Sequence, residues 1–274
     1  TTYVSQLSEE LRRAFSINVT ILAKDGGPQG ATILGGGPGK FILRTLRELE
    51  RLAPDAVHAH GHWYSLAAAL LYRRRHTKTK VVFTQHTEFE DLSRIRRWLL
   101  RLLLSQPEFF AAVSEDLLGR TLRSVRPHVR TRVVYPGVSV RPAAPGEIET
   151  LRETADLLGQ GPFIAFVGPL SYERKSQGVA ELVRSMKRVR QRFPGAVLLV
   201  AGDGRHRKPL EDLADREIPR GSVFLGTVEN PAAVFAVADV VAHISLQEGL
   251  PLAVLEAMAW GRPIVATPAG GIPE

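Results

Sequence analysis

Short apolar runs alternate with longer segments of helical periodicity from one end of the sequence to the other. In the first half, strands are predicted at 18–23, 56–60, 80–84, 109–113 and 132–135. The neighbouring segments repeat apolar residues at the spacing of one helix face and predict helices at 5–15, 41–52, 65–75, 92–104 and 116–124. This alternation is typical of βαβ units, whose strands form parallel sheets.

The pattern stops at Pro142, Pro145 and Gly146 and then restarts, which indicates a hinge. In the second half, strands are predicted at 163–167, 196–201, 223–225 and 240–246, and helices at 179–193, 209–215, 231–237 and 252–260. We therefore predict an α/β protein with an N-terminal Rossmann-like domain at 1–142, a linker at 143–160 and a C-terminal Rossmann-like domain at 161–274.

Composition excludes several classes of protein. With 274 residues, 44% apolar and 23% charged, the chain has the composition of a soluble globular protein and the length for two domains. It contains no Cys, which excludes disulfides, Cys-ligated zinc and thiol catalysis. No apolar stretch approaches the ~20 residues of a membrane span, and no signal peptide is recognisable, so we expect a cytoplasmic protein.

Charge is divided unevenly along the chain. Residues 1–145 carry 22 Lys and Arg against 12 Asp and Glu, a net charge of +10, whereas residues 146–274 have a net charge of −2; together they give the +8 of the whole chain. A basic half suggests an acidic partner, either an anionic membrane surface or nucleic acid, although a solvated Arg-rich surface explains it equally well. Because no nucleic-acid-binding motif accompanies the charge, we expect no nucleic-acid partner.

The most informative segment is the last one, 244–274, in which Glu248 and Glu256 lie eight residues apart. Glu248 is in a Gly- and Pro-containing turn after an apolar run, and Glu256 is on the following helix. A strand, a tight turn and a helix N-terminus form an anion site. Eight residues of helix span ~12 Å, so two acids that act on one ligand would contact different parts of it. For Glu248 the alternative is a helix N-cap.

The Glu-x7-Glu spacing, followed by AMAWGRPIVAT and GGIPE, resembles the retaining GT-B glycosyltransferases, family 4 in particular. The resemblance extends over nearly the whole chain. It implies two Rossmann-like domains with parallel sheets that face each other across a cleft, and a nucleotide-diphosphate sugar as co-substrate, without a cofactor. Glu248 would then approach the transferred sugar, with the backbone N–H groups of Gly249 and Leu250, and Glu256 would hold the ribose. Because the family has further segments at both ends, we expect this chain to lack both.

Other donor-site residues follow from the same resemblance. The segment 166–176 is similar to the family's diphosphate-binding stretch and contains Gly168, Arg174 and Lys175, but Pro169 replaces the usual Arg. Cations there would stabilise the leaving diphosphate, although which of the two takes the family's Lys role stays open, and a solvated Arg-Lys pair is the alternative. Gly202 belongs to a Gly-Asp-Gly turn with a mainly structural role, and Val228 ends a loop that would lie against the base.

In the first half, His86 follows a predicted strand, where parallel sheets bind ligands. The resemblance places His86 near the sugar and His60 on the acceptor side. The alternating His58, His60 and His62 also suggest a metal site, but no Asp, Glu or Cys accompanies them, so we expect no metal. The candidate catalytic residues are thus His86, Glu248, Arg174 and Lys175.

The segment 94–104 is a basic amphipathic helix. Arg94, Arg97 and Arg101 lie on one face, and Trp98 and Leu side chains lie opposite. Such a helix either lies on an anionic bilayer or packs its Leu face on the sheet. The Gly-rich run 25–40 fails the phosphate-loop pattern, since Leu34 and Phe41 occupy required positions, and we predict a flexible connection there.

Together these features predict a retaining, metal-independent glycosyltransferase that moves a sugar from a UDP-, GDP- or ADP-sugar to a glycan, lipid or small-molecule acceptor. The alternatives are a non-catalytic nucleotide-sugar-binding homologue, and a GT-B nucleotide-sugar epimerase or hydrolase. We expect the protein in the cytoplasm, with peripheral attachment to the inner face of the membrane as the alternative.

Overall fold

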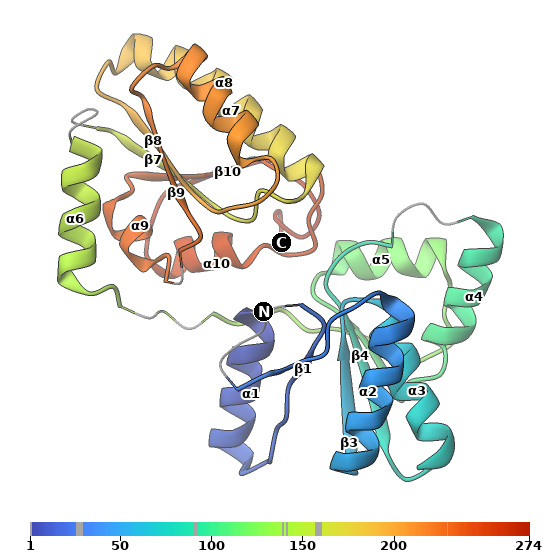
Figure 1. Ribbon diagram of the computed structural model, residues 1–274. Helices are drawn as coiled ribbons and strands as arrows, with labels where there is room; N and C mark the ends of the chain where they lie inside the picture. Colours follow the sequence, from blue (N-terminus) through green and yellow to red (C-terminus); the bar gives the residue numbers. More distant parts are fainter. Residues whose placement is uncertain are drawn as a thin grey trace. The chain divides into compact units, whose positions relative to one another are not determined.

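The computed structural model describes residues 2–25, 30–89, 93–138, 140, 142–156, 161–228 and 230–274 (Figure 1). The chain forms two compact units. The first unit comprises Thr1–Gly137 together with Glu274, and the second comprises Val138–Pro273. Each unit is a parallel sheet with helices packed against it, which confirms the predicted α/β class.

The first unit contains a main sheet and a separate strand pair. Its helices are α1 (Thr2–Phe15), α2 (Pro38–Leu52), α3 (Trp63–Arg75), α4 (Arg94–Leu104) and α5 (Glu115–Ser124). Parallel strands in the order β3-β4-β5-β6 make the sheet, with bounds Ala56–His60, Lys80–Gln85, Phe109–Ala112 and Thr131–Val133. Two short strands, β1 (Leu22–Ala23) and β2 (Thr32–Ile33), pair with each other.

The second unit has one parallel sheet in the order β11-β10-β7-β8-β9. In chain order its strands are β7 (Phe163–Val167), β8 (Val197–Ala201), β9 (Ser222–Gly226), β10 (Val240–His243) and β11 (Ile264–Ala266). The helices are α6 (Pro145–Asp156), α7 (Glu173–Arg192), α8 (Arg207–Glu217), α9 (Ala232–Val237) and α10 (Leu252–Ala259). The chain builds the sheet in one direction from β7 and then returns to its other side with β10. The carboxyl ends of β7 and β10 therefore flank a topological switch point, where open parallel sheets bind ligands.

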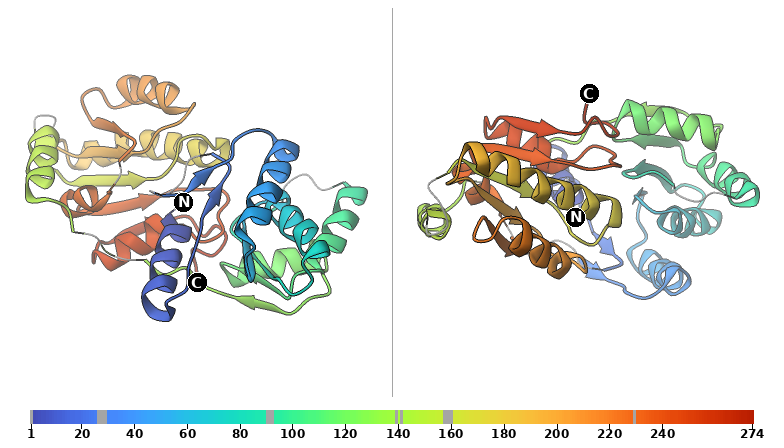
Figure 2. Two further views of the ribbon diagram at one scale, coloured as in Figure 1. Left: turned by 60° about the horizontal axis from the view of Figure 1, so that its bottom comes forward. Right: turned by 90° about the horizontal axis from the view of Figure 1, so that it is seen from above.

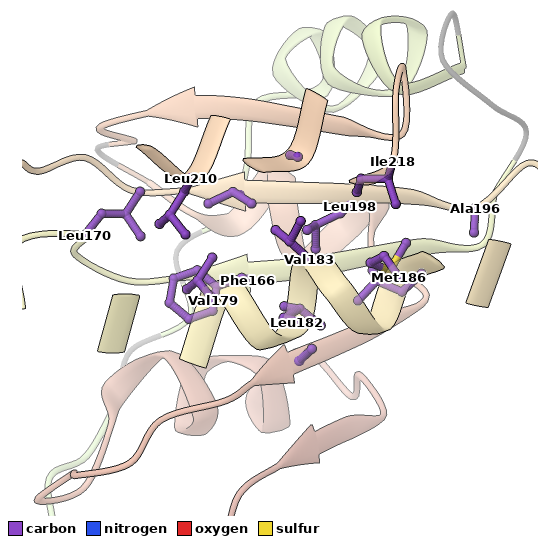
Figure 3. Close-up of a cluster of buried hydrophobic side chains, with 14 residues drawn as sticks. Phe166, Leu170, Val179, Leu182, Val183, Met186, Ala196, Leu198, Leu210 and Ile218 are labelled. Carbon is purple, nitrogen blue, oxygen red and sulfur yellow. The ribbon is translucent and has the colours of Figure 1, made fainter. Parts of the chain in front are cut away.

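Both faces of this sheet are covered by helices (Figures 1 and 2). On one face, Phe166 and Leu198 of the sheet pack with Val183 and Met186 of α7 and with residues of α8 (Figure 3). On the other face, alternate residues of β7 and β8 pack with α6, α9 and α10. Burial on both faces explains why these strands are continuous apolar runs rather than alternating ones.

Several predicted elements differ from the structure. The predicted strand 18–23 is reduced to β1, and the helix predicted from residue 179 begins at Glu173, because its first turns are polar and carry no apolar period. The predicted linker 143–160 contains α6, whose Leu151 is buried in the second unit's core; residues 157–160 lie outside the described residues. The Gly-rich run 25–40, predicted as a flexible connection, contains β2 and the start of α2, and its residues 26–29 lie outside the described residues. Residue 92 of the predicted helix 92–104 also lies outside them. The strand β11 was not predicted.

We predict that Gly178→Ala destabilises the protein, although Ala in a helix interior is normally ~1 kcal/mol more stable than Gly. A Cβ at Gly178 of α7 would lie 1.9 Å from the carbonyl oxygen of Ile244, so helix and loop must separate. We expect a loss of about 1–3 kcal/mol in urea denaturation. Gly146→Ala in α6 is the matched control, because nothing lies within 4 Å of its Cβ position. A Gly178→Ala protein as stable as the control would contradict the packing of α7 on this loop.

Candidate functional site

The turns after β7 and β8 pack directly on each other through their backbones. The N–H of Gly168 donates to the carbonyl of Ala201 at 2.9 Å, and that of Leu170 donates to the carbonyl of Asp203 at 2.9 Å. A Cβ at Gly202 would lie 1.9 Å from the Gly168 carbonyl oxygen. Glycine is therefore required at position 202 by close backbone approach, as the predicted structural role implies. Contact of Gly202 or Gly168 with a donor stays a prediction.

The turn that carries Glu248 is fixed by the segment after β11. The N–H of Gly271 donates to the carbonyl of Gly249 at 2.7 Å, and a Cβ at Gly270 would lie 1.9 Å from the carbonyl oxygen of Glu248. The hydroxyl of Thr267 also accepts a hydrogen bond from the N–H of Ser245 at 2.9 Å. The segment 267–271, which includes the two glycines of the GGIPE motif, thus packs on the Glu248 turn and holds it in place.

Glu248 is the centre of a buried polar cluster at the switch point. Its Oε1 lies 2.9 Å from Lys175 Nζ, near the start of α7, and 2.9 Å from His243 Nε2, at the end of β10. The side chains of Glu248 and Lys175 are 10% and 15% exposed. Burial alone would raise the pKa of Glu248, but the hydrogen bond from His243 and the positive charge of Lys175 outweigh it and lower the pKa to about 2. Glu248 is therefore a carboxylate near neutral pH.

The structure separates the two adjacent cations. Lys175 contacts Glu248, and its side chain also passes close to Gly168, whose Cβ position lies 3.7 Å from Lys175 Cδ. Arg174 is exposed, as is Pro169 in the preceding turn. The N-cap of α10 is Pro251, so Glu248 is not the helix cap that its turn also suggested.

Glu256 lies on α10 and is half-buried. Burial raises the pKa of its carboxyl. Within the ranges that the structure describes, no hydrogen bond or ion pair reaches this carboxylate, so it is an acceptor suited to the hydroxyls of a ligand. Val228 and Leu250 are partly buried, and Val228 packs against the core of the second unit.

In the first unit, His58, His60 and His86 form one cluster with Tyr3 of α1, in which His60 and His86 are partly buried and His58 is exposed. His60 Nδ1 lies 3.0 Å from His86 Nε2, and His58 Nε2 lies 2.8 Å from Thr84 Oγ1. The Tyr3 ring contacts the rings of His60 and His86 edge-on. Burial lowers the pKa of His86 to about 4, and burial with the neighbouring histidines lowers that of His60 to about 2. Both are neutral imidazoles at pH 7.

His62 leaves this group and stacks on Tyr64. In the part of the chain that the structure describes, no group of three or more His, Asp or Glu residues could hold a metal ion.

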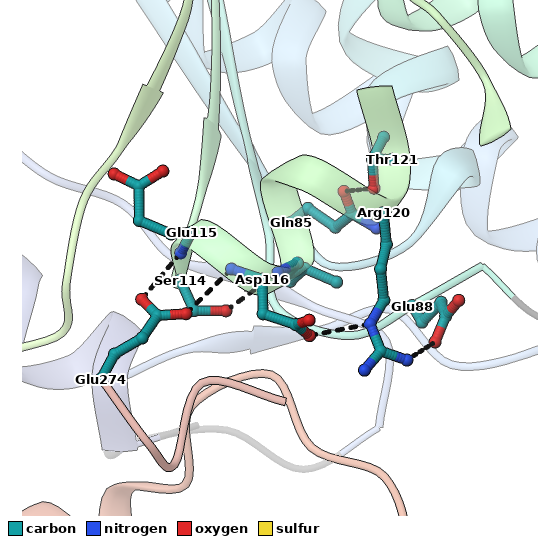
Figure 4. A network of polar contacts seen from close by, with 9 residues as sticks. Gln85, Glu88, Ser114, Glu115, Asp116, Arg120, Thr121 and Glu274 are labelled. Carbon is teal, nitrogen blue, oxygen red and sulfur yellow. Dashed lines mark hydrogen bonds and ion pairs between the residues drawn. The ribbon is translucent and has the colours of Figure 1, made fainter. Parts of the chain in front are cut away.

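The N-terminus of α5 in the first unit is satisfied by a carboxylate of the same unit (Figure 4). The Glu274 carboxylate accepts hydrogen bonds from the backbone N–H groups of Glu115 and Asp116, both at 2.8 Å. The Ser114 hydroxyl caps a third N–H, that of Leu117. These N–H groups of α5 are therefore already paired, whereas within the described residues the N-cap residue of α7, Tyr172, makes no side-chain capping hydrogen bond.

Two α/β units with parallel sheets, the second with a polar cluster at its switch point, are the features of a GT-B glycosyltransferase. The chain belongs to glycosyltransferase family 4: the model "Glycosyltransferase Family 4" matches residues 1–141, and "Glycosyl transferases group 1" matches residues 161–274.

Among relatives, the chain is 27% identical over 176 residues to N-acetyl-alpha-D-glucosaminyl L-malate synthase from Bacillus anthracis, covering 64% of this chain and 45% of that one. It is 28% identical over 261 residues to a GDP-mannose-dependent monoacylated alpha-(1-6)-phosphatidylinositol monomannoside mannosyltransferase from Corynebacterium glutamicum, covering 85% and 68%. The chain thus spans about half the length of the first relative and about two thirds of the second.

A solved structure with the same fold is Alr3699/HepE from Anabaena in complex with UDP-glucose. It superimposes with a TM-score of 0.72 at 19% identity and covers 88% of this chain and 68% of that chain.

We predict that the partly buried His60 and His86 make the protein acid-sensitive. In the unfolded chain each histidine binds a proton near pH 6.5, whereas His86 in the folded protein does so only near pH 4. The unfolded state then binds more protons, so stability present above pH 6.5 is lost as the pH falls towards 4. We expect the melting temperature to drop by several degrees from pH 7 to pH 5, since each shifted histidine contributes on the order of 1–2 kcal/mol.

The control compares two substitutions in the same unit. His86→Gln should flatten this pH dependence, and replacement of the exposed His128 by Gln should leave it steep. Equal slopes in both variants would show that His86 does not cause the acid sensitivity.

Proposed function

We propose that the chain carries the donor site of a retaining glycosyltransferase that moves a sugar from a nucleotide-diphosphate sugar to an acceptor. The observation that carries the proposal is the Lys175–Glu248 pair at the switch point between β7 and β10, with the half-buried Glu256 on the next helix. Membership of glycosyltransferase family 4 supports it. The relatives' names include a GDP-mannose-dependent enzyme, and the Anabaena structure holds UDP-glucose, which supports the donor class without selecting the base.

In this proposal each candidate site residue of the second unit contacts one part of the donor. Lys175 and the first-turn N–H groups of α7 stabilise the negative charge that develops on the leaving diphosphate. Glu248 is ionised and accepts hydrogen bonds from sugar hydroxyls, while its charge stabilises the positive sugar ring in the transition state. Glu256 accepts hydrogen bonds from the ribose. The backbone at Gly168, Gly202, Val228, Gly249 and Leu250 shapes the same site, and the exposed Arg174 contributes less than Lys175.

The acceptor would contact the first unit at His60 and His86. Both imidazoles are neutral at pH 7, so they can orient an acceptor hydroxyl without adding charge. Retention follows if the leaving phosphate removes the proton of the acceptor hydroxyl on the face from which it departs. Since Lys175 and the helix N-terminus supply the positive charge, we propose that the reaction needs neither a metal ion nor a cofactor.

We also propose that α4 lies on an anionic membrane surface, at the inner, cytoplasmic face. Ile95, Trp98 and Leu99 are 72%, 59% and 52% exposed, and Arg94, Arg96 and Arg97 are exposed beside them. Leu100 and Leu104 of the same helix are buried, so α4 both packs on its unit and presents a second apolar surface outward. Apolar side chains flanked by arginines match an anionic bilayer, at ~1 kcal/mol per basic residue. In the described ranges, no helix is long and apolar enough to cross a membrane.

We predict that one of UDP, GDP and ADP raises the melting temperature at millimolar concentration. A ligand at 100 times its Kd adds ~2.7 kcal/mol to the folded state. Glu256→Ala should abolish the shift, and Glu149→Ala, at an exposed position of the same unit, should retain it. If no nucleotide shifts a cooperative transition, the donor site is refuted. Incubation with the corresponding nucleotide sugar separates the alternatives. Release of free sugar or of an epimer in the absence of an acceptor would favour the hydrolase or epimerase, and binding without any turnover would favour the non-catalytic homologue.

We predict that Lys175→Ala weakens binding of the same nucleoside diphosphate about 10- to 100-fold in calorimetry, because a charged hydrogen bond is worth about 1.5–3 kcal/mol. Arg174→Ala, the adjacent exposed cation, should change the Kd less than about threefold, as a surface charge contributes little. A larger loss of affinity in Arg174→Ala than in Lys175→Ala would show that Arg174, and not Lys175, contacts the diphosphate.

We predict that the chain sediments with vesicles of phosphatidylglycerol and phosphatidylcholine but not with phosphatidylcholine alone. Trp98→Ser with Leu99→Ser should reduce the bound fraction at least fivefold, because the inserted apolar area is lost (~25 cal/mol per Å²). Leu43→Ser, which changes an equally exposed apolar residue on α2, is the control. Equal loss in the control would contradict a specific role for α4.

A further inference from the structure

His243 is a buried polar residue that the sequence motifs leave unexplained. It ends β10, is 1% exposed, and lies five residues before Glu248. Its ring stacks on that of Phe166 from the neighbouring strand β7, with ring centroids 5.9 Å apart and an interplanar angle of 15°. Strand and stack together hold the imidazole in one orientation.

The hydrogen bond from this ring has a defined direction. His243 Nε2 lies 2.9 Å from Glu248 Oε1, and a carboxylate only accepts hydrogen bonds, so Nε2 carries the proton. An imidazole that donates through Nε2 fixes the plane of the carboxylate that it contacts.

Both partners of Glu248 use the same oxygen. Lys175 Nζ and His243 Nε2 each lie 2.9 Å from Oε1, whereas Oε2 has no hydrogen-bond partner among the described residues. Lys175 has a long, flexible side chain and is the cation that a diphosphate would attract. His243 is held by the strand and by Phe166 and has no such freedom. When Lys175 turns towards a diphosphate, His243 is the contact that keeps Glu248 in place.

We propose that His243 is a positioning residue that donates its Nε2–H to Oε1 of Glu248 and thereby keeps Oε2 directed at the hydroxyls of the bound sugar. The inference rests on the proposed function and deepens it, because it assigns the residue that controls the sugar half of the donor. His243 acts through Glu248 alone, so its effect is confined to the sugar and leaves recognition of the nucleoside diphosphate unchanged. A histidine with only a packing role would affect both halves equally.

The test compares two classes of ligand in three proteins. Wild type, His243→Leu and His243→Gln are titrated by calorimetry with UDP, GDP and ADP, and with UDP-glucose, UDP-N-acetylglucosamine, GDP-mannose and ADP-glucose. For the nucleotide that binds wild type, we expect His243→Leu to raise the ratio of the nucleotide-sugar Kd to the nucleoside-diphosphate Kd about tenfold, the loss of one hydrogen bond to a charged group. The Kd of the nucleoside diphosphate itself should change less than twofold. His243→Gln, whose amide can donate from nearly the same place, should restore most of the ratio.

Other results of these titrations separate a failure of the positioning role from a failure of the donor site. An unchanged ratio in His243→Leu, or an equal weakening of both ligands, overturns the positioning role while the donor site stands. Wild type that binds neither ligand class overturns the proposed function and this inference with it. If His243→Leu does not fold, the long-range ¹H–¹⁵N spectrum of wild type decides: a proton on Nε2 supports the inference, and a neutral ring protonated on Nδ1 overturns it.

Discussion

The ion pair between Lys175 and Glu248 is the central interaction of the candidate site at the switch point, where the strands β7 and β10 of the second unit end. Both side chains are largely removed from water, which costs several kcal/mol per ion unless geometry and further hydrogen bonds compensate. His243 supplies the additional hydrogen bond to Glu248. Such a pair contributes little net stability, so its value lies in placing a cation and an anion at one point. A diphosphate and a sugar present the complementary charges and hydroxyls.

Close backbone approaches make that placement possible. Gly178 allows α7, which carries Lys175, to contact the carbonyl of Ile244 just before the Glu248 turn. Gly270 allows the segment after β11 to reach the carbonyl of Glu248 itself. Gly202 brings the turn after β8 against the turn after β7. Segments from distant parts of the sequence are therefore held together at three glycines whose surroundings leave no room for a Cβ.

The sequence predicted the fold class because that depends on local patterns, and it predicted a candidate ligand site at Glu248 and Glu256 for the same reason. Buried parallel strands are continuous apolar runs, and the Glu-x7-Glu spacing is visible without coordinates. Short or polar elements were missed: β2 has two residues, and the first turns of α7 carry no apolar period. The choice between Arg174 and Lys175 depends on the direction of two adjacent side chains at the start of α7, which periodicity does not specify. His243 was missed because its partner lies across a turn, although a histidine that ends a buried strand was a usable signal.

The most direct measurement is a crystal structure of this chain with the nucleotide-diphosphate sugar that stabilises it most. We expect the diphosphate at the start of α7 in contact with Lys175 Nζ, the ribose hydroxyls on Glu256, and the sugar on Glu248, which keeps its bond to His243. A diphosphate bound away from the switch point, with the Lys175–Glu248 pair intact and Glu256 free of the ribose, would contradict the proposed donor site.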